Sequence, residues 1–192
     1  MKIFLLVLAV SLTRLWADEV APRSVALEAQ IATQNMADEV RRGNFRVTID
    51  SMYPRWKGRM AGRSGGEAAL EKRLLSAMDQ IKKGGVTIQS FTAAEPTTVL
   101  GVWRQKRLVD GEEKFIPTEW MALVPTTTTL RVAAKGEVHR VQSDGFQVAI
   151  RPINGGEWTF IDGRTLEMAE LRAVFPSVPK DLQLPKRGGK KL

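Results

Sequence analysis

The sequence predicts an α+β fold in which helices come first, an antiparallel sheet follows and a short helix closes the domain. Up to residue 83, apolar residues recur every three to four positions, which is typical of amphipathic helices. From Val86 onward they alternate, and short runs are separated by turn pairs such as Asp110-Gly111. With 192 residues, of which 43% are hydrophobic and 26% charged, the chain is long enough to bury one core.

The first residues differ from the rest. Lys2 is followed by an apolar run over 3–10, and the small Ala17 precedes Asp18-Glu19. This order is typical of a secretory signal peptide, and the run is shorter than the ~20 residues that a spanning helix needs. We therefore expect cleavage after Ala17, a secreted or periplasmic location and no transmembrane span after processing. An uncleaved membrane anchor is the alternative.

Composition excludes several kinds of chemistry. The chain has no cysteine and one histidine, which excludes thiol chemistry, disulfides and a zinc site of Cys and His ligands, so we expect no metal and no cofactor. The formal charge of +8 falls by two, to about +6, when Lys2 and Arg14 leave with the signal peptide. Export makes nucleic acid an unexpected partner. A solvated basic surface and contact with an anionic envelope polymer both remain open.

Three helices are expected before the sheet. The first runs over 24–40 with Ser24 as its N-cap, and the second runs from residue 45 until Pro54 ends it. The basic, glycine-rich segment 55–66 is interpreted as a flexible linker. A third helix over 67–83 carries its acids early and its lysines late, as the helix dipole prefers.

The sequence from Val86 onward predicts an antiparallel sheet. Residues 118–124 are apolar on both faces, which indicates a central strand covered on both sides, and Pro125 is expected to end it. Further strands are expected at 127–133, 145–151 and 157–162, and a last helix at 165–175. The predicted organisation is a signal peptide (1–17), a polar leader (18–25), a single domain that includes the C-terminal helix (26–176) and a mobile basic tail (177–192).

Helices followed by antiparallel strands and the closing segment 157–163 resemble the nuclear transport factor two-like superfamily. The steps Tyr53-Pro54 and Glu95-Pro96 and the proline-containing end of the chain are similar to exported bacterial members. The resemblance implies a cystatin-like cone, in which N-terminal helices pack into a strongly curved antiparallel sheet and leave an apolar cavity. Some relatives, which are ketosteroid isomerase-like or polyketide cyclase-like, transfer protons, whereas others only bind. The fold often forms homodimers through its sheet.

Three aromatic residues are candidates to line such a cavity. Tyr53 could offer its hydroxyl group to a ligand, with Trp56 as a wall, and Trp120 lies on the expected central strand. Packing in the core is the alternative interpretation for each of them.

Two acids complete the candidate ligand-binding set. Glu119 precedes Trp120 on the central strand, although a pairing with Arg131 on a neighbouring strand would also explain it. Asp162 could point toward the aromatic interior as a base, but Gly163 after it favours binding of backbone amides at a turn. No residue is assigned as catalytic.

The leading hypothesis is a non-enzymatic exported binding or interaction module with an apolar cavity for a small apolar ligand or a partner protein. The first alternative is a cavity enzyme of the isomerase or lyase type. The second is a basic structural protein of the envelope, held to anionic polymer by segment 55–66 and the cluster 186–191.

Overall fold

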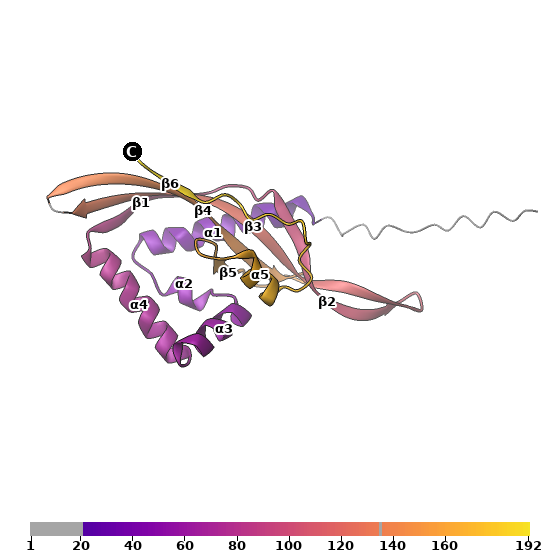
Figure 1. Ribbon diagram of the computed structural model, residues 1–192. Helices are drawn as coiled ribbons and strands as arrows, with labels where there is room; N and C mark the ends of the chain where they lie inside the picture. Colours follow the sequence, from indigo (N-terminus) through magenta and orange to yellow (C-terminus); the bar gives the residue numbers. More distant parts are fainter. Residues whose placement is uncertain (1–20, 135) are drawn as a thin grey trace, which may run out of the picture.

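The computed structural model describes residues 21–134 and 136–192 (Figure 1). The expected signal peptide and the start of the leader lie outside the described residues. The α+β class is confirmed, and the large antiparallel sheet stays open. The elements are α1 (Arg23–Arg41), α2 (Val47–Asp50), α3 (Pro54–Ser64), α4 (Glu67–Lys83), β1 (Val86–Ala93), β2 (Thr98–Val109), β3 (Glu112–Ala134), β4 (Glu137–Pro152), β5 (Thr159–Asp162), α5 (Met168–Val174) and β6 (Gly188–Lys191).

The sheet is organised around β3 and β4. Its order is β1-β3-β4-β5, while β2 pairs with the first part of β3 and β6 pairs with β4. Figure 1 shows the far end of the β2–β3 hairpin extending away from the helices. Its turn at Asp110-Gly111 has positive φ angles of 54° and 81°, as a two-residue hairpin turn requires.

Pro125 does not end the central strand, and β3 continues for nine residues beyond it. The last β2 partner of β3 is Leu123, and the first β1 partner is Thr126. The carbonyl of Pro125 accepts a bond from the Ala94 amide, which follows β1. The nitrogen of Pro125 faces the same edge of β3, at the gap between the end of its pairing with β2 and the start of its pairing with β1. The proline costs the ladder no bond there.

Both faces of the central strand are covered, as its apolar pattern predicts. Met121 and Leu123 pack in a cluster with Leu171 and Val174 of α5. On the opposite face, small alanines let α1 approach closely. They are Ala29 of α1, Ala93 of β1, Ala122 of β3 and Ala149 of β4.

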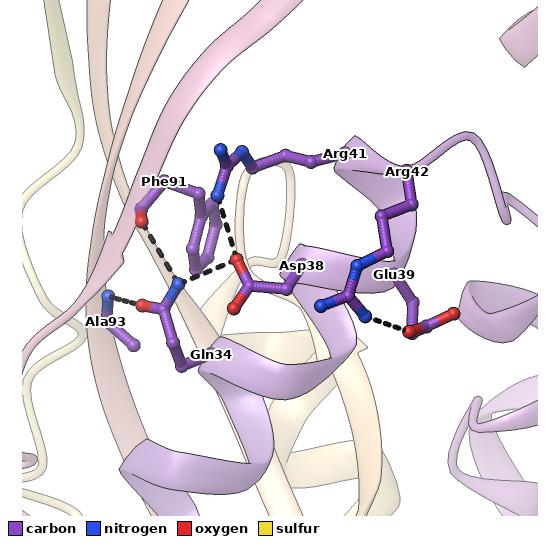
Figure 2. A network of polar contacts seen from close by, with 7 residues as sticks. All are labelled: Gln34, Asp38, Glu39, Arg41, Arg42, Phe91 and Ala93. Carbon is purple, nitrogen blue, oxygen red and sulfur yellow. Dashed lines mark hydrogen bonds and ion pairs between the residues drawn. The ribbon is translucent and has the colours of Figure 1, made fainter.

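A side chain of α1 satisfies the outer edge of β1 (Figure 2). Gln34 donates from Nε2 to the Phe91 carbonyl at 3.1 Å and accepts from the Ala93 amide at 3.0 Å. Asp38 accepts a third bond from Gln34 and an ion-paired bond from Arg41. The side-chain amide thus takes the place of a neighbouring strand at an edge that would otherwise be open.

The expectations for the helices before the sheet are partly wrong. Segment 55–66 is mostly helix α3, because Pro54 occupies the first helical turn, where a missing N–H costs nothing. The helix ends at Gly65, whose φ of 84° suits a glycine. The first helix has Pro22 at its N-cap position in place of Ser24. Helix α4 covers 67–83 as expected.

The end of the chain also differs from expectation. The last strand starts at Thr159 and the last helix covers only 168–174. The first part of the segment expected to be a mobile tail packs on the core, where Val178 is buried and Leu182 contacts the same apolar cluster as α5. Residues 188–191 then add to β4 beyond the point where β5 stops, since the unpaired edge there accepts any backbone.

Candidate functional site

A polar contact between distant segments of the chain joins Tyr53 and Glu119. A short stretch before α3 runs beside β5: Met52 bridges Phe160, and the Tyr53 amide donates to the Phe160 carbonyl at 2.9 Å. This places the Tyr53 ring on the α5-side of the sheet, where its hydroxyl donates to Glu119 Oε2 at 2.8 Å. Two of the five predicted site residues are therefore brought together.

The Tyr53 side of this pair is buried beneath Phe175. Tyr53 is 3% exposed, and the Phe175 ring stacks on it with centroids 5.2 Å apart and an interplanar angle of 28°. Burial raises the pKa of Tyr53, and the hydrogen bond to Glu119 and the charge of that carboxylate raise it further. The phenol therefore stays protonated and serves as a donor, and its single proton is already used.

Trp103 lies beside the pair in a strained conformation. Its φ of 52° falls in the left-handed region, which a bulky residue adopts at a cost. Thr118 Oγ1 donates to its carbonyl at 2.5 Å, and Pro117 of β3 has no N–H to offer β2. The β2–β3 ladder is therefore interrupted where it leaves the body of the protein.

The indole ring of Trp103 has a cation above it and a buried N–H. The Arg55 guanidinium lies over it with Cζ 3.4 Å from the ring centroid, a close cation–π geometry. The indole Nε1 of Trp103 is buried and lies toward the Tyr53 hydroxyl, where it opposes part of the rise in the Tyr53 pKa, although the two groups do not form a well-directed hydrogen bond. Trp103 therefore belongs to the same polar cluster as Tyr53 and Glu119.

The two tryptophans among the predicted site residues lie on opposite sides of the sheet. Trp56 is half-buried and packs against the same apolar cluster as Tyr53. Trp120 is 5% exposed and points to the opposite face of β3 from Glu119, because adjacent strand residues alternate. Its direct partner across the sheet is Arg151, which forms an ion pair with Glu28 of α1.

The two predicted acids differ in their surroundings. Asp162 is exposed and accepts from the Arg164 amide at 3.0 Å and from its guanidinium at 2.6 Å, which is the turn interaction that Gly163 favoured. Glu119 does not pair with Arg131, because both residues belong to β3, where they lie twelve positions apart. Its cross-strand neighbours are Val102 and Pro152.

Two shallow surface hollows lie away from the Tyr53–Glu119 pair. One is lined by Val132, His139 and Val141 together with residues 189–191 of β6. The other lies along α4 beside Glu71 and Leu75. Within residues 21–134 and 136–192, no three acidic or histidine side chains gather as metal ligands would. None of the helices there is long and apolar enough to cross a membrane.

Sequence reasoning missed Arg55, Trp103 and Phe175 around the pair. Phe175 ends the segment expected as the last helix, 165–175, but its place over Tyr53 depends on the fold. Nothing in the sequence signals a left-handed φ at Trp103, since glycine or asparagine is the usual residue there. Searches against protein-family models, curated proteins and solved structures found no match to this chain.

Proposed function

We propose that the chain is an exported, non-enzymatic binding module that works through an open surface of its sheet. The observation that carries the proposal is the closure of the Tyr53–Glu119 pair. A proton-transfer site needs a base and a donor that both face a substrate. Here the donor is spent on the acid and covered by Phe175.

Side chains pack against the sheet where the family resemblance implies an apolar cavity. Side chains from α5 and the tail cover one face of the central sheet, and α1 covers the other. The module therefore binds on the part of the sheet that these elements leave uncovered. A surface of this kind suits a large partner better than a small apolar ligand.

Membership of the nuclear transport factor two-like superfamily, with a cone-shaped sheet, belongs to the same proposal. It is supported by the chain order of helices before antiparallel strands and by the packing of α1 across one sheet face. Export is supported by the pattern of residues 1–17, and dimerisation through the sheet by the family resemblance.

A cavity enzyme of the isomerase or lyase type is the second candidate. The strained Trp103, next to a buried phenol that donates to a half-buried carboxylate, favours it. For this function Phe175 would have to move away and admit a substrate between Tyr53 and Trp103.

Turnover assays on the mature chain from Asp18 separate the two candidates. We expect no isomerisation of β,γ-unsaturated ketones above the buffer rate. Turnover that is lost in both Tyr53→Phe and Glu119→Gln, yet kept in the exposed-acid control Asp162→Asn, would overturn the proposal. Co-sedimentation of the mature chain with washed cell-envelope fragments tests binding directly, and we expect Tyr53→Phe to sediment as well as the unmodified chain.

A further inference from the structure

The half of the sheet beyond α5 presents an exposed polar face. Alternate residues of a strand share a face, so the side that carries Met121 and Leu123 at the centre of β3 carries Thr129 and Arg131 farther along. On β4 the same side carries Arg140 and Gln142. Serine and threonine from β1 extend it, since Ser90 pairs with Thr129 and Thr87 with Arg131.

Three positively charged side chains lie on neighbouring strands of this face, one each on β3, β4 and β6. Arg131 of β3 lies directly opposite Arg140 of β4, and Gln142 of β4 lies directly opposite Lys190 of β6. All three cationic side chains are exposed. Neighbouring strands lie ~4.8 Å apart, so the charges form a compact patch across three strands. We call Arg131, Arg140 and Lys190 the basic face.

The chain does not neutralise the basic face. Like charges directly opposite each other destabilise a sheet. Among the described residues, no ion pair includes Arg131, Arg140 or Lys190. Asp144 lies on the same face and accepts bonds from the uncharged Thr127 and Gln142, whereas Glu137 lies on the other face, 3.0 Å from His139 Nε2. A repulsive pair that the fold itself leaves without a counter-charge points to an anion from outside the molecule.

The side chains around the three cations indicate which class of anion would bind there. Hydroxyl and amide groups of Thr129, Gln142 and Ser90 lie between the charges and match a ligand rich in hydroxyl groups. The strand positions that make up this half-face include no aromatic side chain of the kind on which nucleic-acid bases stack. Its large exposed apolar side chains are Val138 and, beside Arg140, Leu192, whereas membrane-surface binding relies on a continuous apolar face.

We infer that the basic face binds an extended acidic polysaccharide, with carboxylate or sulfate groups on the arginines and sugar hydroxyls on the threonine, serine and glutamine side chains. The inference rests on the proposed binding function and names its partner and surface. It also assigns a role to the tail, because pairing of Gly188–Lys191 with β4 is what brings Lys190 beside Gln142.

The test measures the affinity of the mature chain for polygalacturonate as a function of NaCl concentration, with neutral dextran as the reference polymer. Arg131→Gln/Arg140→Gln removes two charges from the basic face. Lys72→Gln/Arg73→Gln removes two exposed charges from α4 and is the matched control. We expect the first pair to weaken binding about tenfold or more and to flatten the salt dependence by roughly two contacts, and the control to change affinity less than about twofold.

Equal weakening by both double variants would overturn the inference, because binding would then follow net charge alone. Tighter binding to single-stranded poly(dT) or to anionic phosphatidylglycerol vesicles than to polygalacturonate would also overturn it. Thermal unfolding identifies a variant that lost affinity by misfolding, and Lys190→Gln, at the end of the sheet, then provides a milder change. If Arg131→Gln/Arg140→Gln still sediments with envelope fragments, the inference fails while the proposed function stands; if the unmodified chain does not sediment, the proposed function fails.

Discussion

The two long strands β3 and β4 pass through two different environments, and their sequences differ accordingly. Around Met121 and Ile150 both faces are buried, and the strands are apolar at consecutive positions. Around Arg131 and Arg140 one face is polar and exposed, and the residues alternate. The covered half supplies the stability of the domain, and the exposed half is free to carry charges that a core could not tolerate.

The largest effect is expected in the covered half. Phe146 is fully buried and contacts the apolar cluster below α5. Phe146→Ala should lower the free energy of unfolding by ~3–5 kcal/mol, because it removes the ring and leaves a cavity. Thr129→Ala on the exposed half should change it by less than about 0.5 kcal/mol. Urea denaturation of both variants checks the contrast, and equal losses would mean that the two halves do not differ as described.

A smaller loss is expected from overfilling the same site. A Cβ added at Gly163 would lie 2.5 Å from the Phe146 ring and from its carbonyl oxygen. Gly163→Ala should therefore cost about 1–3 kcal/mol. The control is Gly58→Ala in α3, where a Cβ meets nothing within 4 Å and should stabilise the helix by up to ~1 kcal/mol. Differential scanning calorimetry should show melting shifts of opposite sign.

Tyr53→Phe tests the closed pair. It removes the donor to Glu119 and leaves a half-buried carboxylate with one bond fewer, which should cost ~1–3 kcal/mol. Because the pKa of Tyr53 is raised in the folded state, its contribution to stability is full below the unfolded pKa of about 10 and is lost as the pH rises above it. Tyr53 is the sole tyrosine, so tyrosinate absorbance reports it alone. A native chain that ionises near pH 10 would contradict the closed geometry.

The smallest stability effect is expected at the edge of the exposed half. Deleting residues 188–192 removes β6, all of whose residues are exposed, and should change the free energy of unfolding by less than about 1 kcal/mol. It also uncovers the edge of β4 from Val141 to Asp144. We expect concentration-dependent association of the truncated chain in sedimentation velocity experiments, since bare edges pair with other chains. A strictly monomeric truncated chain would show that β6 does not protect this edge.

Local patterns predicted the parts of the fold that depend on local physics. The stripe over 67–83 matches α4, and the apolar run 118–124 marks the covered part of β3. Pro54 was misread because a proline that ends one helix and a proline that begins the next look the same in sequence. Helix α3 forms despite Gly58 and Gly62, with Lys57 paired to Glu67 of α4.

Features that depend on distant partners could not be predicted in the same way. Tyr53 and Glu119 were each singled out, but their contact spans 66 positions and depends on the bridge from Met52 to β5. The tail of glycines and lysines has little tendency to form a strand by itself. It does so because β4 presents an unpaired edge beyond β5, which only the assembled sheet reveals.

The arrangement of strands around β3 also favours an order in which the strand pairs form during folding. The β2–β3 and β3–β4 hairpins join segments that are adjacent in the sequence, so little chain entropy is lost when they close. The β4–β6 pairing joins Val141 to Lys191 and uses residues that are synthesised after the rest of the sheet. The hairpins of the covered half can therefore form before β6 docks on β4, and the basic face is complete only after that docking.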